Sequence, residues 1–476
     1  MNFNMNDQRN QMGELMQEFI PAMLSSYENM KSKDVFGITD KALIERLRSI
    51  GIPKEGRPLR EVFQEMLDSV YTNQAYLQHP RCFAFIPCPV SPLSWMGDIM
   101  TSAYDLHAGS WMLSSGASCI EQEVIQWMCG LAGYPQTAGG LFVSGGSMAN
   151  LTALAAARDA KLTDEERTRA VAYVSEQTHS SVAKGLHIIG FRRDQVRKIP
   201  TDSAFRMDTR ALRKAIEQDT KDSHRPFVVV ATAGTTNVGS IDPLTEISAL
   251  CKEHDMWMHV DGAYGASILV SSKYRHLLRG IELSDSISWD AHKWLMQTYS
   301  CSAVLVKDLT NLEQSFSTHP EYLKDAAAKK DQINFWDLGP ELTRPARSLK
   351  FWITLQVMGT ESLGQMVEHG FQLAQWAEDE LKKLSDWEII SPAQQAIINF
   401  RYAPKGISEN QLDCINQQIA QEISDSGYAG IVTTELNEKK VLRICALHPE
   451  TTEEEMRKTI RLLNRYACGL SSRLSD

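Results

Sequence analysis

A lysine stands between a histidine and a tryptophan in the stretch SISWDAHKW, residues 286–294, where an apolar strand is expected to end. A single lysine in such a place is most often an ordinary solvated residue. A lysine reacts with an aldehyde only when its amine is unprotonated and held close to the reacting carbon. Lys293 therefore has a chemical role only if other groups in the fold form a site around it.

Asp261 ends a second apolar run, WMHV, and small residues including Ala263 follow it. A carboxylate at the end of a buried strand is costly unless a cation pairs with it. The ordinary explanation is an aspartate that caps the next segment. The functional alternative is that Asp261 pairs with a buried cation, such as a protonated pyridine nitrogen, and that Ala263 leaves room for a flat ring.

A glycine-rich turn connects a strand to a helix in LFVSGGSMANLTALAAAR, residues 141–158. Gly145, Gly146 and Ser147 would expose backbone N–H groups at the start of the helix, where the helix dipole favours a phosphate. A tight connection that binds no ligand would have the same sequence. The turn by itself is therefore a weak indication of a phosphate site.

Two further residues follow apolar strands. His179 comes after AVAYVS and begins a helix, where its imidazole either caps the helix or stacks on an aromatic ring, and Thr236 comes just after PFVVVATAG. The turn, His179, Asp261 and Lys293 occur in the order expected of a pyridoxal phosphate site. Lys293 would bind this cofactor covalently, and Asp261 would keep its ring nitrogen protonated so that the ring accepts electrons from the substrate Cα.

The pattern of apolar segments predicts an α/β protein. Residues 14–75 show helical spacing, and the stretch HPRCFAFIPCPVSP is expected to be extended because Pro80, Pro87, Pro89 and Pro92 exclude a helix. From about residue 140, apolar runs without alternation separate amphipathic segments, which predicts a mostly parallel sheet between helices. These runs include AVAYVS, PFVVVATAG, MWMHVDGAYG and SCSAVLVKD.

A change of pattern after residue 365 predicts a separate small α+β region. It contains a helix, GFQLAQWAEDELKKL, strands within EIISPAQQAIINFRY and KVLRICALH, and a last helix, EEEMRKTIRLLNRYA. We therefore expect an N-terminal helical segment (1–78), a large domain with the cofactor site (79–365) and a small C-terminal domain (366–476). In the large domain, the reacting groups should lie beyond the carboxyl ends of the strands.

Composition narrows the class of protein. The 476 residues are 43% hydrophobic and 23% charged, as in soluble globular proteins. A net charge of −10 without a basic block argues against nucleic acid and anionic membranes as partners. The nine cysteines form no metal-ligand spacing, so free thiols and no metal are expected. No signal peptide is found and no apolar run reaches the roughly 20 residues of a membrane span, which predicts a cytoplasmic protein.

Six motifs of this sequence resemble those of one known family. They are SGGSMAN, THSSVAKG, AGTTNVGSID, HVDGAYG, DAHKW and PEYLKD. They are similar to the group II pyridoxal-phosphate-dependent decarboxylases, which include aromatic-L-amino-acid decarboxylase, and within that group to bacterial tryptophan decarboxylases. The likeness is strong from Pro80 to Leu363 and weaker beyond. It implies the aminotransferase-like fold (fold type I) and a homodimer with active sites near the interface.

The resemblance also implies roles for individual residues. Lys293 matches the lysine that binds pyridoxal 5′-phosphate, and Asp261 matches the partner of its ring nitrogen. Positions around the ring and the phosphate are matched by His179, Ala263, Gly146, Ser147, His292 and Thr236. Tyr322, in HPEYLKDAAAKKDQ, matches a tyrosine on a loop that closes over the site and protonates Cα. Relatives that form aldehydes tend to carry phenylalanine there, so Tyr322 favours an amine product.

The resemblance implies an aromatic side-chain pocket formed by Phe85, Pro87 and Trp111, with Thr236 and Tyr322 also near the substrate. An apolar pocket without a nearby basic residue argues against glutamate, whose second carboxylate would be unpaired. Arg347 is the nearest basic candidate, but it resembles a structural arginine. The expected reaction is decarboxylation of aromatic L-amino acids to amines and carbon dioxide, with tryptophan the leading substrate. A preference for phenylalanine, tyrosine or DOPA, and an aromatic aldehyde synthase, remain the alternatives.

Overall fold

The computed structural model describes residues 5–37, 40–318, 321 and 332–475. The chain forms two compact units. The large unit comprises residues 88–379 and 389–399, and the small unit comprises residues 1–87, 380–388 and 400–476. The three-part division at residues 78 and 365 stays a prediction.

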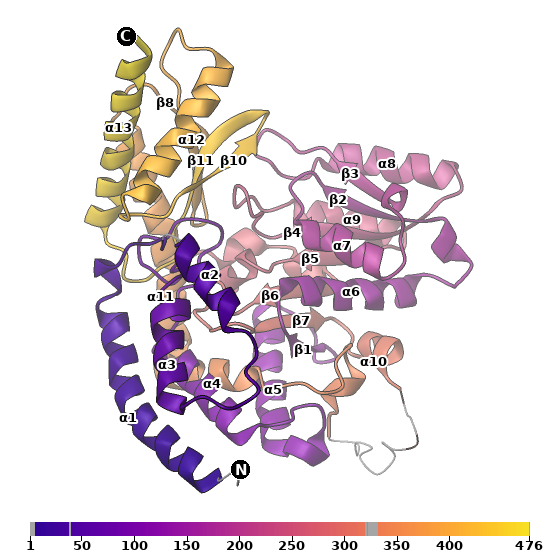
Figure 1. Cartoon of the computed structure of the whole chain (residues 1–476). Coiled ribbons are helices and arrows are strands. Elements are labelled where there is room, and N and C mark those ends of the chain that lie inside the picture. The colour runs from indigo at the N-terminus through magenta and orange to yellow at the C-terminus, as the bar shows by residue number, and fades with distance from the viewer. Residues whose placement is uncertain (1–4, 38–39, 319–320, 322–331, 476) are drawn as a thin grey trace. The chain divides into compact units, whose positions relative to one another are not determined.

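A seven-stranded sheet is the centre of the large unit (Figure 1), with strand order β1-β7-β6-β5-β4-β2-β3. Its strands are β1 Gly139–Val143, β2 Ala170–Ser175, β3 Val196–Ile199, β4 Arg225–Thr232, β5 Trp257–Asp261, β6 Ser286–Asp290 and β7 Ser302–Val306. The pairs β2/β3, β2/β4, β4/β5 and β5/β6 are parallel. This confirms the mostly parallel sheet that the apolar runs predict.

One strand differs from that expectation. The run SCSAVLVKD contains β7, which is antiparallel to both β1 and β6. Residues 291–301 connect β6 to β7 as turns and bends. They are too few for a parallel return, which requires a crossover of about a dozen residues or more. Because β7 alone is reversed, β1 and β6 point the same way and their carboxyl ends reach the same edge of the sheet.

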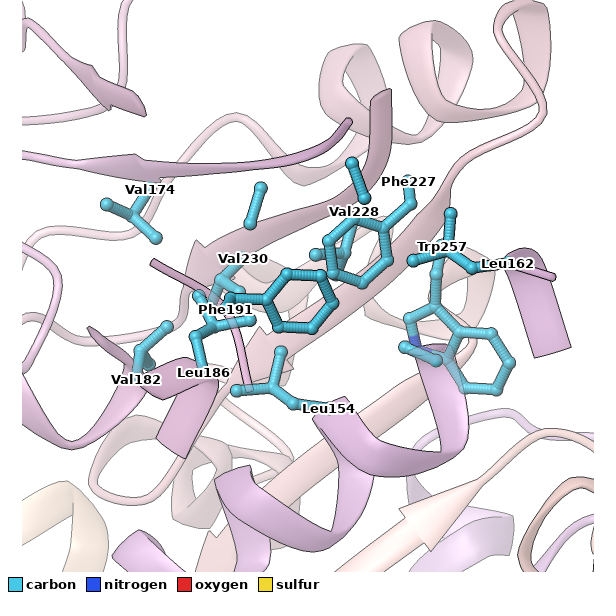
Figure 2. Packing of buried hydrophobic residues seen from close by; sticks show 13 residues of the cluster. Leu154, Leu162, Val174, Val182, Leu186, Phe191, Phe227, Val228, Val230 and Trp257 are labelled. Carbon is cyan, nitrogen blue, oxygen red and sulfur yellow. The ribbon is translucent and has the colours of Figure 1, made fainter. Parts of the chain in front are cut away.

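The strands are apolar along their length because helices cover the sheet. All residues of β1, β2, β5, β6 and β7 are buried. Figure 2 shows one face of this packing, where Val174, Val228 and Val230 meet Leu154 of one helix and Leu186 of another. This burial supplies the rigid frame from which the residues at the strand ends project.

The helices of the large unit include the connections between strands. They are α4 Pro92–Tyr104, α5 Trp111–Leu131, α6 Gly146–Lys161, α7 Ser180–Ile188, α8 Thr209–Lys221, α9 Leu244–Glu253, α10 Thr310–Phe316 and α11 Ser348–Leu381. Pro92 was expected within an extended stretch, but it begins α4 behind the cap of Ser91, since proline lacks only an N–H that the first turn does not use. The helix expected to start at Gly370 is the last part of α11, which bends at Gly359.

The small unit begins with the helices expected between residues 14 and 75. They are α1 Met5–Glu28, α2 Lys41–Ile50 and α3 Leu59–Met66, and the unit also contains α12 Glu409–Asp425 and α13 Glu453–Ser475. A second sheet has the order β10-β11-β9-β8, formed by β8 Trp387–Gln394, β9 Ile397–Tyr402, β10 Val432–Leu436 and β11 Lys439–Cys445. In this sheet β10 and β11 belong to the small unit, whereas residues 389–399 of β8 and β9 belong to the large unit. Among the described residues, no helix combines the length and apolarity that crossing a bilayer requires.

Candidate active site

A cavity of about 400 Å³ lies in the large unit at the residues that follow β1, β2, β4, β5 and β6. Since these strands point the same way, the residues after them meet at one edge of the sheet, as open α/β folds require of their sites. All eight residues expected to bind the cofactor line this cavity: Gly146, Ser147, His179, Thr236, Asp261, Ala263, His292 and Lys293. The sequence therefore identified residues that the fold brings together.

The glycine-rich turn forms the N-terminus of α6 at this cavity. Gly145 precedes the helix and no side chain caps it. The neighbouring side chains leave no room for a side chain at residue 146, because a Cβ there would lie 2.8 Å from Asp290 Oδ2 and 3.1 Å from the Ala263 Cβ. An uncapped helix N-terminus with a bare backbone offers N–H groups and a favourable dipole to an anion.

Asp261 is the last residue of β5, and it is 5% exposed. Its carboxylate accepts hydrogen bonds from Asn150 Nδ2 at 3.0 Å, from the Ala263 N–H at 3.2 Å and from Ser288 Oγ at 3.3 Å. Three converging donors suit an ionised carboxylate, which can only accept. Asp261 thus presents a fixed negative charge at the cavity, which suits a cationic ring nitrogen.

His179 is the N-cap of α7 and also lines the cavity. Its Nδ1 accepts from the Ser181 N–H at 3.2 Å and lies 2.8 Å from Ser181 Oγ. The capping role, one of the two alternatives for this residue, is thus present. Stacking on a cofactor ring stays a prediction. The capping hydrogen bonds hold the imidazole at the wall of the cavity, which is where a residue that stacks on the ring would have to lie.

Lys293 lies three residues beyond the end of β6, and its Nζ lies 3.0 Å from Asp290 Oδ2. The Asp290 side chain is 2% exposed and the Lys293 side chain is 24% exposed, so the carboxylate is removed from water while the amine still reaches the cavity. The motif DAHKW contains Asp290, but the sequence analysis assigns no role to this residue. Its spacing could have indicated one, because a carboxylate at the end of a strand can fold back toward the amine of a lysine three residues later.

His292 stands between these two charged residues in the sequence. Its Nδ1 donates to the Cys301 carbonyl at 3.0 Å. Burial lowers the pKa of His292 against the opposing effect of the Asp290 carboxylate, which leaves the imidazole neutral near pH 7. The unprotonated Nε2, 3.7 Å from Asp290 Oδ2, is then available as an acceptor.

Two buried oxygen atoms show that the cavity suits a polar ligand. Asp290 Oδ1 and Thr232 Oγ1 have no hydrogen-bond partner within the part of the chain that the structure describes, and both residues line the cavity. Buried polar atoms normally have partners, so unpaired ones at a cavity are consistent with a ligand. With an anion-binding helix start, an amine and a strand-end carboxylate, these residues fit pyridoxal 5′-phosphate.

The residues expected around the substrate are less completely placed. Phe85 and Pro87 belong to the small unit, and Tyr322 lies outside the described residues. Trp111 begins α5, where its backbone N–H donates to Asn334 Oδ1 at 3.0 Å. Trp111 is not among the residues that line the cavity. Thr236 does line it. Arg347 pairs with Glu341 through two bonds of 2.7 and 2.9 Å, as a structural arginine would.

Comparison with known proteins identifies the family. Residues 43–403 match the pyridoxal-dependent decarboxylase conserved domain, and the chain belongs to this family. It is a carboxy-lyase with pyridoxal 5′-phosphate as its cofactor, and its fold is the aminotransferase-like fold type I that the resemblance implied.

Three relatives show the range of activities among similar proteins. The chain is 38% identical to an aromatic-L-amino-acid decarboxylase of Bacillus atrophaeus, over 96% of this chain and 95% of that protein. It is 28% identical to a phenylacetaldehyde synthase of Arabidopsis thaliana, over 98% and 96% of the two chains. Its fold matches the crystal structure of Oryza sativa TDC with PLP and tryptamine with a TM-score of 0.91, at 26% identity and 99% coverage of both chains.

Proposed function

We propose that this protein decarboxylates aromatic L-amino acids to the corresponding amines and carbon dioxide, and that tryptophan is its leading substrate. The observation that carries the proposal is the meeting of Lys293, Asp261 and the α6 N-terminus in one cavity. The 38% identity to a bacterial aromatic-L-amino-acid decarboxylase supports the substrate class. The similar fold of a protein solved with tryptamine supports tryptophan within that class.

Each residue of the cavity has a proposed task. Lys293 would hold the cofactor covalently through its amine. Gly146, Ser147 and the α6 N-terminus bind the phosphate. Asp261 keeps the proton on the ring nitrogen. When bound, pyridoxal 5′-phosphate supplies an electron sink for the bond between Cα and the carboxylate.

The faces of the ring and its other substituents have their own proposed partners. His179 and Ala263 would contact the two faces of the ring, His292 would lie on the phosphate side, and Thr236 would lie near the ring hydroxyl and the substrate carboxylate. His179 and Thr236 both line the cavity. These contacts orient the substrate so that the breaking bond can align with the ring.

The charge around the cavity supports an uncharged side chain on the substrate. Among the described residues that line it, Lys293 is the only lysine or arginine, and the proposed function uses its amine for the cofactor. A substrate with a second carboxylate would therefore bury an unpaired charge. We assign the aromatic side chain to Phe85, Pro87 and Trp111, as the family resemblance implies.

Tyr322 separates this proposal from the main alternative, an aromatic aldehyde synthase, which is favoured by the similarity to phenylacetaldehyde synthase. We assign to Tyr322 the return of a proton to Cα after carbon dioxide leaves. In Tyr322→Phe, carbon dioxide release should persist in air while the product shifts from amine toward aldehyde, ammonia and peroxide. Amine output unchanged from the wild type would reject the role of Tyr322.

A substrate panel tests the proposed function. Purified holoenzyme receives L-tryptophan, L-phenylalanine, L-tyrosine or L-DOPA, with L-glutamate as the control, and carbon dioxide, amine, aldehyde and oxygen uptake are measured. We expect equal amounts of amine and carbon dioxide, without oxygen uptake, and the highest kcat/KM for tryptophan. No turnover of any aromatic substrate would reject the proposal, and oxygen uptake with aldehyde release would favour the synthase.

We also propose that the protein is a cytoplasmic homodimer. Met96, Met100 and Tyr104 are exposed along α4 at intervals of four residues, so they share one face of that helix. Met112 and Leu113 at the start of α5 are exposed as well. Large apolar side chains that gather on a surface favour contact with another protein. A second copy of this chain is the partner that the family resemblance implies.

A further inference from the structure

A chain of buried polar side chains extends from Asp261 into the interior of the large unit. His259 precedes Asp261 by two residues in β5, and its side chain is fully buried. The proposed reaction gives these interior residues no task. Buried polar groups are costly unless they are satisfied, and a fully satisfied network fixes one arrangement of its members.

The distances show a continuous network. Asn150 Nδ2 lies 3.0 Å from Asp261 Oδ2, and Asn150 Oδ1 lies 2.9 Å from His259 Nε2. On the other side of the imidazole, His259 Nδ1 lies 2.8 Å from Ser286 Oγ, which also accepts from Trp257 Nε1 at 2.8 Å. None of these five residues is more than 5% exposed. Water therefore does not compete for their hydrogen bonds.

The direction of each bond follows from the charge on Asp261. An ionised carboxylate only accepts, so the Asn150 atom facing it is the amide nitrogen. The Asn150 oxygen then faces His259, and His259 Nε2 must donate to it. Burial lowers the pKa of His259 to about 4, so the imidazole is neutral near pH 7 and carries one proton. That proton is on Nε2, and Nδ1 accepts from the Ser286 hydroxyl.

The same amide reaches the second residue proposed to contact the ring. Asn150 Nδ2 lies 3.0 Å from Ser181 Oγ, which lies 2.8 Å from His179 Nδ1. The Ser181 N–H also donates to that Nδ1, so Nδ1 is an acceptor and the His179 proton is on Nε2. Asn150 is thus connected to both Asp261 and His179.

We infer that His259 is a positioning residue for the cofactor site, because its Nε2–H holds the Asn150 carbonyl and thereby turns the Asn150 amide nitrogen toward Asp261. The inference rests on the proposed role of Asp261 at the ring nitrogen. Without this donor the Asn150 amide can rotate and present its oxygen to Asp261. The Asn150 oxygen and the Asp261 carboxylate would then be two acceptors at hydrogen-bond distance, which favours the protonated form of Asp261. A protonated Asp261 no longer keeps the proton on the ring nitrogen.

The variants separate this role from simple burial. His259→Phe keeps a ring of similar size and removes both nitrogens, and His259→Gln keeps an amide donor in place of Nε2–H. Tyr173→Phe is the matched control, since it removes another fully buried hydrogen bond of the same sheet, from Tyr173 OH to Asp219 at 2.9 Å. Asp219 and Tyr173 do not line the cavity.

The measurements use holoenzyme loaded with cofactor labelled with ¹⁵N in the ring. We expect His259→Phe to shift the ring ¹⁵N signal toward the unprotonated form and to weaken cofactor affinity about tenfold. It should lower kcat with little change in KM, because the ring nitrogen matters when the bond breaks. His259→Gln should recover most of each effect, and Tyr173→Phe should show none of them. A ring signal, affinity and kcat unchanged in a folded His259→Phe protein would overturn the inference.

A second measurement needs no substitution. In wild-type protein labelled with ¹⁵N-histidine, the imidazole of His259 should carry its proton on Nε2 at pH 7, and a proton on Nδ1 would overturn the inference even if His259→Phe fails to fold. Both measurements can be made without turnover. A wild-type protein that binds cofactor but converts no aromatic amino acid would reject the proposed function, and the ring signal and tautomer would still decide the role of His259.

Discussion

At the level of residues, the Asp290 carboxylate, whose side chain is 2% exposed, pairs with the Lys293 amine at the wall of the cavity. The eight residues that the motifs predict to bind the cofactor all line one cavity, because each of them lies at or just beyond the end of a strand. Asp290 was missed because its task depends on how the turn after β6 folds back, which places its carboxylate 3.0 Å from the amine. The links from Asn150 to His259 were likewise invisible, since they join residues far apart in the sequence.

Asp290→Asn should make covalent attachment of the cofactor less dependent on high pH. The Asp290 carboxylate stabilises the ammonium form of Lys293, and only the free amine attacks an aldehyde. In cofactor-free protein mixed with pyridoxal 5′-phosphate, the pH midpoint of the attachment rate should be lower in the variant than in the wild type. Absorbance at a series of pH values measures this rate. An unmoved or higher midpoint would contradict the assigned pairing.

At the level of elements, the apolar runs predicted most strands and their parallel arrangement, because a strand covered on both faces has a recognisable composition. They did not predict the reversal of β7, since direction depends on the length of the connection and not on the strand. The last helix before the second sheet was expected to start at Gly370, and in the structure it continues from Ser348. The start of α6 is the element on which the phosphate site depends.

Gly146→Ala should weaken cofactor binding about tenfold while the protein still folds, because the added Cβ would lie 2.8 Å from Asp290 Oδ2 and push that side chain into the cavity. Cofactor titration followed by absorbance gives the affinity. Gly130→Ala, in α5, is the control, since a Cβ there meets nothing within 4 Å. Equal affinity in the two variants would show that the cavity does not need a bare backbone at residue 146.

At the level of the whole molecule, net charge and composition argued against nucleic acid and anionic membranes as partners, but they could not locate the surface proposed for the dimer. That proposal depends on which apolar residues the fold leaves exposed, and Met96, Met100 and Tyr104 of α4 are exposed. The division into compact units was also outside the reach of composition, because residues 380–388 and 400–476 join the N-terminal residues in one unit.

Met100→Glu should convert the proposed dimer into monomers, since a charge placed in an apolar contact has no partner there. Sedimentation equilibrium over a range of protein concentrations measures the mass. Ile188→Glu provides the control, because Ile188 is exposed at the end of α7 rather than on α4. A dimer as tight as the wild type in the Met100 variant would show that this face of α4 is not the interface.

Stability should fall as the pH is lowered from about 6.5 to 4. Burial lowers the pKa of His79 and His259 to about 4 and that of His448 to about 3, from an ordinary value of 6.5. In this window the unfolded chain binds protons that the folded protein does not, so protonation favours unfolding. Asp242 and Asp285 oppose the trend, because burial raises the pKa of both carboxyls, to about 6 for Asp242, but four histidines act in the other direction, since burial lowers the pKa of His292 as well. Urea midpoints should be lower at pH 5 than at pH 7, and an equal or higher midpoint at pH 5 would refute this balance.

The proposed function depends most directly on Lys293, which we propose holds the cofactor in the cavity at the carboxyl ends of the strands. Reduction of the holoenzyme with borohydride makes the bond between lysine and cofactor permanent, and digestion followed by mass spectrometry then locates it. We expect the added mass on the peptide that contains Lys293, and no such label in Lys293→Ala. A label on a different lysine of the wild-type protein, or none after loading with cofactor, would contradict this role of Lys293.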